Sequence, residues 1–301
     1  MITTTMTSLT LTAPAKVNLF LKVLKKRKDS YHSIETVFER ISIADTITIT
    51  KIPKGIRLSS DVRITGRPEA NLAHKAARLI LDHKKAAGGV SIRIKKRIPI
   101  AAGLGGGSSD AATVLMGINR LYGLRIGKEE LSRLGRRLGA DVPFFIMEEP
   151  FALGKGIGER LKALQWRRRF WHLVVYPGFK VPTGKVYEAF DRKGGSKCLT
   201  TRRRGVRIQL PRKFALDLCT AEAMLYNDLE RIVVAKYGAI RALIGRLATL
   251  VGKKAILSGS GPSVFCLCAT RKEALEARRI LLRHVPARAK RRWRTFIAKT
   301  S

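Results

Sequence analysis

A glycine-rich segment is the first part of the chain whose residue types and spacing could do chemistry. It runs from Pro99 to Ala112 and places four glycines and two serines ahead of a helical pattern. Glycines let the backbone approach an anion closely and point successive N–H groups at it. Ser108 and Ser109 are expected to cap the following helix, whose N-terminus adds partial positive charge. The segment therefore predicts a phosphate-binding loop.

The residue order separates this loop from two common phosphate-binding motifs. No Lys-Ser or Lys-Thr pair follows Gly107, as a P-loop would require. Counted from Gly103, the sixth position of the dinucleotide motif G-x-G-x-x-G is Ser108 instead of glycine. The remaining alternative is a flexible turn before a helix, and the density of glycine and serine favours phosphate binding.

Lys16 and Asp141 are the charged residues best suited to phosphoryl transfer onto an alcohol. A carboxylate can accept the hydroxyl proton, and an ammonium group can keep that carboxylate ionised and stabilise the transferring group. Lys16 lies within an otherwise apolar run, where an unpaired charge would be costly. Asp141 lies at a bend between Gly139 and Pro143. The alternatives are a lysine that snorkels from an edge strand and an aspartate that merely ends a helix.

The elements that must position these residues follow from hydrophobic periodicity. In the first half, strands are expected at 17–23, 45–52 and 90–96, helices at 71–85, 111–122 and 128–138, and a loop at 99–109. In the second half, strands are expected at 171–176, 255–258, 263–268 and 295–298, and a helix at 272–284. A charged stretch at 165–170 suggests two domains, residues 1–165 and 166–301. The order of elements indicates an α+β fold, with helices set against a largely antiparallel sheet.

Three segments together resemble a known superfamily. The segment Pro-x-x-x-Gly-Leu-Gly-Gly-Gly-Ser-Ser-x-Ala-Ala is similar to the ATP-binding motif of the galactokinase, homoserine kinase, mevalonate kinase and phosphomevalonate kinase superfamily. Pro14–Leu19 resembles its N-terminal strand motif, and Leu257–Phe265 resembles its third, glycine-rich motif. The resemblance implies a two-domain small-molecule kinase, with a ribosomal-protein-S5-like N-terminal domain and a ferredoxin-like C-terminal domain.

Four local features resemble one branch of this superfamily, the 4-diphosphocytidyl-2-C-methyl-D-erythritol kinases. They are Tyr31-His32, where Ser30 replaces the usual glycine; Gly139–Phe144; Tyr176–Gly178 with Thr183 and Tyr187; and Asn227–Leu229. The resemblance implies that ATP phosphorylates the 2-hydroxyl of the erythritol unit, in non-mevalonate isoprenoid synthesis. A homoserine or mevalonate type of kinase is the alternative, since it would share the phosphate loop but would not need the cytosine contacts.

The resemblance also implies roles for individual residues. The catalytic residues would be Lys16 and Asp141. ATP would be bound by Pro99, Ile100, Ala101, Ala102, Gly103, Leu104, Gly105, Gly106, Gly107, Ser108, Ser109, Asn71 and Lys96. The cytidine diphosphate substrate would be bound by Asn18, Tyr31, His32, Thr183 and Tyr187, with the pyrimidine stacked between the two tyrosines and its polar edge read by His32. Mg²⁺ would arrive with ATP and be held mainly through its phosphates.

The charge of the chain is far from zero. Its 301 residues include 60 Lys+Arg and 22 Asp+Glu, for a formal net charge of +38. This excess predicts affinity for polyanions, although few aromatic residues interleave with the basic clusters to stack bases. A basic nucleic-acid-binding protein on the same fold is therefore the third functional hypothesis. A more limited version is a kinase whose basic surface binds nucleic acid non-specifically.

Cysteines, histidines and the chain start bear on location. The four cysteines (Cys198, Cys219, Cys266 and Cys268) form no C-x-x-C pair and are expected to be reduced, as in the cytoplasm. The five histidines show no metal-ligand spacing, so no structural metal site is expected. No apolar stretch approaches membrane-spanning length, and residues 1–13 lack the pattern of a secretory signal. A cytoplasmic location is expected.

Overall fold

The structure, a computed structural model, describes residues 7–62, 66–84, 86–194 and 216–301. The chain forms two compact units. Unit 1 comprises Met1–Ala15, Ile43–Ile100 and Gly105–Glu149, and unit 2 comprises Lys16–Ser42, Ala101–Leu104 and Pro150–Ser301. The domain boundary after residue 165 stays a prediction. Cys198 and most of the basic segment 192–213 lie outside the described residues.

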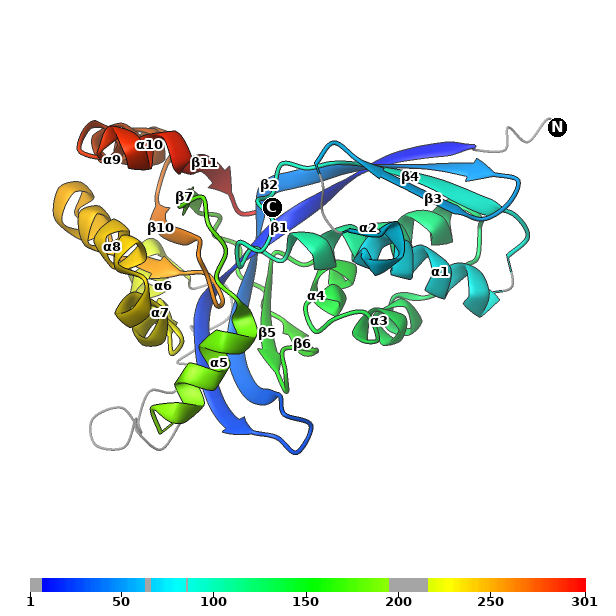
Figure 1. Cartoon of the computed structure of the whole chain (residues 1–301), viewed down its shortest axis with the longest axis horizontal. Coiled ribbons are helices and arrows are strands. Elements are labelled where there is room, and N and C mark those ends of the chain that lie inside the picture. The colour runs from blue at the N-terminus through cyan, green and yellow to red at the C-terminus, as the bar shows by residue number, and fades with distance from the viewer. Residues whose placement is uncertain (1–6, 63–65, 85, 195–215) are drawn as a thin grey trace. The chain divides into compact units, whose positions relative to one another are not determined.

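The sheet of unit 1 uses parts of two long strands and two short ones (Figure 1). They are β1 (Ser8–Lys26), β2 (His32–Ile52), β3 (Ile56–Ser60) and β4 (Gly89–Lys95). β4 lies between β2 and β3; it is antiparallel to β2 and parallel to β3. Along β2, Ile43, Ile47 and Ile49 are buried, whereas the intervening threonines are partly exposed. One side of the strand therefore faces the core of unit 1.

The helices of unit 1 pack on one another, and two of them contact the sheet. They are the short 3₁₀ helix η1 (Pro68–Ala70), α1 (Leu72–Lys84), α2 (Gly106–Leu121), α3 (Lys128–Arg136) and α4 (Val142–Met147). α1 packs against α2. α2 comes close to β2 at Gly117, where an added Cβ would lie 2.5 Å from Cδ1 of Ile49. The predicted helices at 71–85, 111–122 and 128–138 are thus present.

The start of α2 corrects the sequence analysis. The helix begins at Gly106, five residues before the expected Ala111, and its N-cap is Gly105 with a left-handed φ of 70°. Ser108 and Ser109 therefore lie inside the first turn and do not cap the helix, contrary to expectation. Tertiary packing overrides the loop-forming tendency of these small residues, because Ser109 and Asp110 are buried at 0% and 2% exposure.

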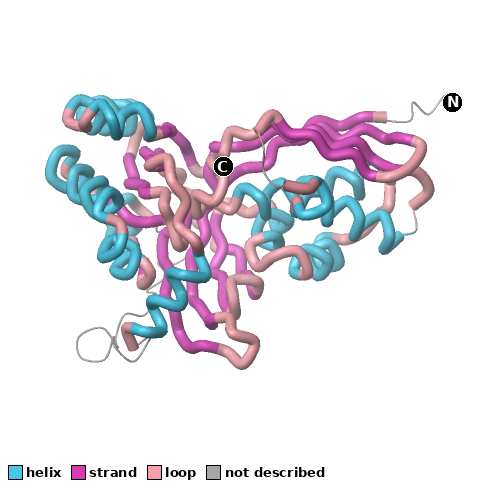
Figure 2. The backbone as a smooth tube through the Cα atoms, in the orientation of Figure 1, coloured by secondary structure: helices cyan, strands magenta, loops and turns pink. Residues whose placement is uncertain are grey.

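The second half of unit 2 contains an antiparallel four-stranded sheet. Its strands are β7 (Trp171–Tyr176), β9 (Ala255–Leu257), β10 (Val264–Cys268) and β11 (Arg294–Lys299), in the order β11-β7-β10-β9. Helices α8 (Gly238–Val251) and α9 (Arg271–Arg283) pack against each other and against this sheet (Figures 1 and 2). Strand, helix, strand, strand, helix, strand is the ferredoxin-like pattern, so the predicted fold of this part is confirmed.

Three short strands and four helices complete the described part of unit 2. β5 (Phe151–Lys155) and β6 (Arg160–Ala163) form a hairpin on β2, and β8 (Tyr226–Asn227) pairs with β1 in parallel. The remaining helices are α5 (Thr183–Arg192), α6 (Leu218–Met224), α7 (Glu230–Lys236) and α10 (Ala287–Arg292). Phe190 of α5 and Leu243 and Leu247 of α8 are fully buried in one core cluster.

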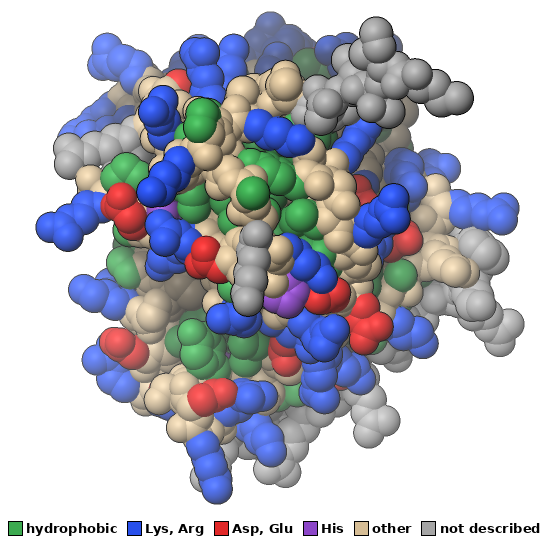
Figure 3. Space-filling model, turned by 90° about the vertical axis from the view of Figure 1, so that its right-hand side faces the viewer, with side chains coloured by type: hydrophobic (Ala, Val, Ile, Leu, Met, Phe, Trp, Pro, Cys, Tyr) green, Lys and Arg blue, Asp and Glu red, His purple; other side chains and the backbone are tan. Residues whose placement is uncertain are grey.

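The surface reflects the composition. Lys and Arg side chains are spread over the face drawn in Figure 3 and are much more numerous there than Asp and Glu. Among the described helices, none is long and apolar enough to cross a membrane.

Candidate active site

Lys16 is the charged residue in a buried series of hydrogen-bonded polar side chains in unit 2. Its Nζ donates to Oδ1 of Asn18 at 2.7 Å, and Nδ2 of Asn18 donates to Oγ1 of Thr36 at 2.8 Å. Thr36 in turn donates to the carbonyl of Phe20 at 2.7 Å. Lys16 and Asn18 are two residues apart on β1 and therefore lie on the same face of the strand. Lys16 is 5% exposed, and its Nζ lies 5.1 Å from the centre of the Phe38 ring.

Residues 101–104, the first half of the glycine-rich loop, are fixed within unit 2 by three hydrogen bonds. The backbone N–H of Lys16 donates to the Leu104 carbonyl at 3.0 Å. Ser258 Oγ donates to the Gly103 carbonyl at 2.9 Å, and the Ser263 N–H donates to the Ala102 carbonyl at 3.1 Å. All three motifs found in the sequence thus meet at this loop.

Gly103 allows this close approach. Its φ is 78°, and an added Cβ would lie 2.2 Å from the carbonyl oxygen of Ser258. A side chain at this position would push the loop away from the third motif. Ala101 and Gly105 also have left-handed φ values, 54° and 70°, so the backbone here reverses direction repeatedly. Such a backbone turns successive N–H groups toward one side, as an anion site requires.

Asn227 holds the glycine-rich turn of the third motif beside Lys16. Its Nδ2 donates to the carbonyls of Leu257 at 2.8 Å and Gly259 at 2.7 Å. A Cβ added at Gly259 would lie 3.4 Å from Oδ1 of Asn18 and 3.8 Å from Nζ of Lys16. The glycine leaves space at the point where the two polar side chains of β1 emerge.

His32 and Tyr187 form a stacked aromatic pair in unit 2. Their ring centres are 4.9 Å apart at 23° between planes, and Nε2 of His32 lies 2.6 Å from Oδ1 of Asp191. Asp191 is one helical turn after Tyr187 on α5, which places both on one helix face. Burial alone would raise the pKa of Asp191, but hydrogen bonds from Lys26 and His32 outweigh it and the pKa is lowered.

Tyr31 does not join this pair. It is 62% exposed at the turn between β1 and β2, next to Ser30, whose φ is 66°. Glycine adopts this left-handed backbone without steric cost, which explains why the resembled family has glycine at this position. One face of Tyr187 is covered by His32, so Tyr31 and Tyr187 do not form a ready-made sandwich. Thr183 Oγ1 lies 2.7 Å from Ser260 Oγ and links the start of α5 to the third motif.

The second half of the phosphate loop belongs to unit 1 and opens α2. A Cβ added at Gly106 would meet Cγ2 of Ile98 at 3.0 Å and lie 3.5 Å from Nζ of Lys96. Ser109 is fully buried, and its Oγ has no hydrogen-bond partner among the described residues. Pro99 is buried and Ile100 half-buried just before the loop. The N-terminus of α2 therefore offers backbone N–H groups, whereas the Ser109 hydroxyl is buried.

A buried ionic cluster joins both ends of this loop. Lys96, the residue after β4, donates through Nζ to Oδ2 of Asp45 and, at 2.8 Å, to Oδ2 of Asp110 in the first turns of α2. Asp45 Oδ1 also accepts from the N–H of Ile98 at 2.8 Å. The Lys96 and Asp110 side chains are 6% and 3% exposed. The predicted ATP residue Lys96 therefore has its ammonium group occupied by two carboxylates.

Burial controls protonation in this cluster. Burial raises the pKa of Asp110 to about 7, with Asp45 adding to the rise and Lys96 opposing it. Burial would lower the pKa of Lys96, but Asp110 and Asp45 outweigh it and the pKa is raised. Oδ1 of Asp110 has no hydrogen-bond partner within the described part of the chain.

Sequence reasoning missed Asp45, Asp110 and Asp191. A signal existed for Asp45, because it shares the buried alternation of β2 with Ile43 and Ile47 and so required a buried partner. Asp110 stood inside the quoted loop without a role. Nothing local pointed to Asp191 as the partner of His32, 159 residues away along the chain.

Asn71 and Asp141 each begin a helix of unit 1. Oδ1 of Asn71 accepts from the N–H of Ala73 at 2.9 Å, and Asn71 is 6% exposed. Asp141 is the residue before α4 and is half-buried, with Pro143 in the first turn of that helix. The expected fixed bend at Asp141 is therefore present.

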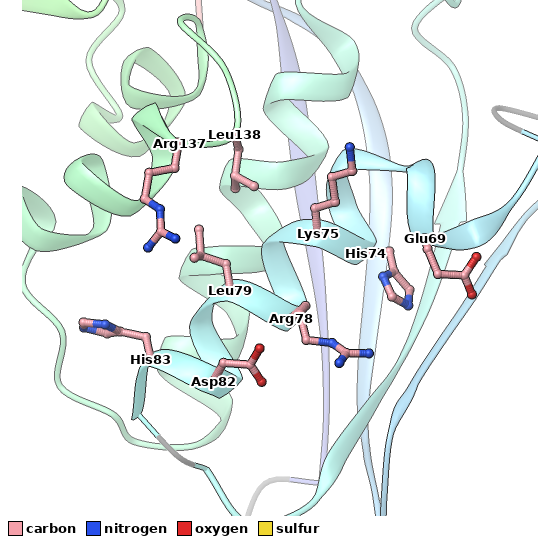
Figure 4. Close-up of a pocket in the computed structure, with 9 residues that line it drawn as sticks. All are labelled: Glu69, His74, Lys75, Arg78, Leu79, Asp82, His83, Arg137 and Leu138. Carbon is pink, nitrogen blue, oxygen red and sulfur yellow. The ribbon is translucent and has the colours of Figure 1, made fainter.

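A hollow of about 660 Å³ lies along the outer side of α1 (Figure 4). Leu79 and Leu138 lie between the Arg137 guanidinium and the Lys75 ammonium group in this view. Glu69 and Asp82 balance part of the positive charge. No residue predicted for the site lines this hollow.

Comparisons with known proteins identify the family of this chain. Residues 71–149 match the family described as GHMP kinases N terminal domain, and residues 215–287 match GHMP kinases C terminal. The chain is 43% identical over 277 residues to a 4-diphosphocytidyl-2-C-methyl-D-erythritol kinase of Pelobacter propionicus, covering 91% of this chain and 94% of the relative. The corresponding kinase of Geobacter metallireducens is 42% identical over 275 residues, covering 89% and 92%.

Solved structures agree. A crystal structure of 4-(cytidine 5'-diphospho)-2C-methyl-D-erythritol kinase matches with a TM-score of 0.75 and 32% identity, covering 97% of this chain and 98% of the other. A homoserine kinase from Cytophaga hutchinsonii matches with a TM-score of 0.72 at 16% identity, covering 100% of this chain and 96% of the other, and supports the fold alone.

Proposed function

This chain belongs to the GHMP kinases, among the 4-diphosphocytidyl-2-C-methyl-D-erythritol kinases, and we propose how its residues divide the work of that reaction. The reaction transfers the γ-phosphoryl group of ATP to the 2-hydroxyl of 4-diphosphocytidyl-2-C-methyl-D-erythritol, in non-mevalonate isoprenoid synthesis. The observation that carries the assignment of residues is the meeting of the three motifs at residues 101–104, beside the buried Lys16.

The glycine-rich loop binds the phosphates of ATP. Its residues Pro99, Ile100, Ala101, Ala102, Gly103, Leu104, Gly105, Gly106, Gly107, Ser108 and Ser109 form the cradle, with the N-terminus of α2 adding positive potential. When bound with ATP, Mg²⁺ would neutralise part of the phosphate charge, and of Ser108 and Ser109 the half-buried Ser108 suits contact with it better than the fully buried Ser109. Asn71 and Lys96 lie beside the adenine, and Lys96 contributes through its backbone carbonyl, because its ammonium group and its N–H are both occupied.

Asp141 accepts the proton of the attacking 2-hydroxyl, and Lys16 assists it. The half-buried carboxylate of Asp141 is fixed at the start of α4, where Pro143 limits backbone motion. Lys16 is oriented by Asn18, and its positive charge suits both the ionised carboxylate and the transferring phosphoryl group. Asn18 faces the same space and binds the substrate.

The cytidine end of the substrate is recognised by Tyr31, His32, Thr183 and Tyr187. The pyrimidine stacks on aromatic rings that Tyr187 and the exposed Tyr31 provide. Asp191 engages Nε2 of His32, so Nδ1 is the nitrogen that His32 offers to the polar edge of the base.

The free thiols of Cys219, Cys266 and Cys268 support a reducing compartment, the cytoplasm.

The test is ATP consumption by the purified protein with the cytidyl substrate and Mg²⁺, alongside homoserine and mevalonate. We expect turnover with the cytidyl substrate alone. Turnover with homoserine or mevalonate would keep the kinase chemistry and refute the cytidine contacts. Folded protein that turns over none of the three would refute the assignment.

A further inference from the structure

The segment from α9 to the start of β11 is densely basic. Residues 271–294 contain ten Lys and Arg but two Glu, a net charge of +8 by 10 − 2. This segment belongs to none of the three motifs of the kinase reaction. Two small anionic substrates do not account for it, because neither is placed there by the site described above.

The basic side chains border a hollow of about 860 Å³ in unit 2. Six cations line this α9–α10 groove: Arg271, Lys272, Arg278, Arg279, Arg283 and Lys290. Leu275 and Leu282 contribute apolar surface to it. The opposite face of α9 is buried through Ala274, Ala277 and Leu281. The helix is thus anchored in the core by one face and presents a cationic face to solvent.

Few of these cations are neutralised within the chain. Among the described residues, Glu276, the acidic residue of the lining, pairs with Arg279. Glu273, the other acid of the segment, pairs with Lys253 of the loop before β9 at 2.5 Å. The other five groove cations form no salt bridge within the described ranges, so the groove keeps a strong positive potential.

The cations on α9 form two rows along the helix. Arg271 and Arg278 are seven residues apart in one row, as are Lys272 and Arg279 in the other, which corresponds to about 10 Å along the axis. Arg283 extends the second row by one more turn. The rows together span about 18 Å, the length over which one strand of a nucleic-acid duplex presents about five phosphates.

The lining also indicates how a polyanion would be bound. It contains no aromatic side chain, so unpaired bases would find no ring to stack on. Apart from the cations, Thr295 and the paired Glu276 are its polar side chains, too few to read base edges. Phosphates are the groups that this surface complements.

We propose that the α9–α10 groove binds the phosphate backbone of double-helical nucleic acid without regard to sequence. Guanidinium groups suit phosphate because they donate in a planar fork. Such binding releases condensed counterions and must weaken steeply with salt. DNA and RNA duplexes share this chemistry, and the lining offers little that would read a 2′-hydroxyl.

The test measures fluorescence anisotropy of a labelled duplex of about 20 base pairs between about 0.05 and 0.3 M NaCl. The groove variant carries Arg278→Gln, Arg283→Gln and Lys290→Gln. The matched control removes the same charge from exposed positions of β3 and β4, with Arg57→Gln, Arg93→Gln and Lys95→Gln. Kinase activity of both variants, expected to equal that of the unchanged chain, confirms that each is folded.

If each of the five groove cations other than Arg279 contacts one phosphate, the slope of log affinity against log salt is about −4 to −5 for the unchanged chain. The three substitutions remove three of these contacts and make the slope less steep by about 3. The groove variant should lose affinity on the order of 10²-fold at about 0.1 M salt, and the control less than about 3-fold. DNA and RNA duplexes of the same sequence should bind alike, and a single strand more weakly.

Three results would overturn the proposal. One is an equal loss in the control, which would mean diffuse attraction to the whole surface. Another is tighter binding of the single strand or of vesicles with anionic lipid. The third is affinity that does not change with salt.

Discussion

The buried carboxyl of Asp110 makes the stability of this kinase depend on pH in an unusual direction. Its pKa is raised from an ordinary 3.8 to about 7, first by burial and then by Asp45, against the opposing effect of Lys96. One carboxyl oxygen accepts from Lys96, and the other has no partner among the described residues. Asp110→Asn keeps the acceptor for Lys96 and removes the titration.

The sign follows from proton binding. Because the folded chain holds this proton up to about pH 7 and the unfolded chain releases it near pH 4, folding is favoured most below pH 4. That contribution is lost as the pH rises to about 7. Over roughly 3 pH units at about 1.4 kcal/mol each, the loss amounts to about 4 kcal/mol. Other groups add their own pH dependence, so the informative quantity is the difference between the two proteins.

The assay is urea unfolding, followed by circular dichroism, at pH 5, 6, 7 and 8. The free energy of unfolding of Asp110→Asn minus that of the unchanged chain should rise by about 1.4 kcal/mol per pH unit between pH 5 and 7. Above pH 7 the difference should level off. The exposed Asp82→Asn, in the same unit, serves as control and should give a constant difference.

A difference for Asp110→Asn that is the same at pH 5 and pH 7 would refute the raised pKa. Such a constant difference is the result expected if Lys96 holds Asp110 ionised in the folded chain, because the unfolded chain is also ionised at these pH values. It would mean that burial is not the dominant influence on this carboxyl.

Three further predictions concern catalysis and binding. Asp141→Asn should lower kcat by about 10²–10⁴-fold while leaving ATP affinity nearly unchanged, as rapid-quench kinetics and ATP titration would show; a retained kcat would rule out Asp141 as the base. Gly103→Ala, whose Cβ would lie 2.2 Å from the Ser258 carbonyl at a φ of 78°, should cost about 1–2 kcal/mol or more in unfolding free energy and raise KM for ATP. The control Gly245→Ala, within α8, has nothing within 4 Å and should do neither, so equal effects would contradict this account of the loop. Tyr187→Leu should raise KM for the cytidyl substrate about 5–150-fold through lost stacking, whereas Tyr187→Phe should not, and steady-state kinetics that fail to separate the two would refute stacking.

The sequence alone predicted a glycine-rich loop at Gly103 with a helix after it. The turn at Gly103 depends on the freedom of glycine to adopt a positive φ, which is a local property of the chain. The strands at 171–176, 255–258 and 263–268 were also predictable, because a short apolar run bounded by turn residues is a local pattern. The lysine in an apolar run at position 16 was correctly identified as a buried charge for the same reason.

Tertiary structure decided which side chains meet. Lys96 finds its partners 51 residues before it and 14 residues after it, and His32 finds Asp191 159 residues later. Periodicity shows that Asp45 faces inward, but not which cation it faces. The start of α2 at Gly106 was likewise set by packing, since burial of Ser109 and Asp110 holds residues helical that would otherwise favour a loop. Local patterns fix the direction of a side chain, whereas its partner depends on how distant segments fold onto one another.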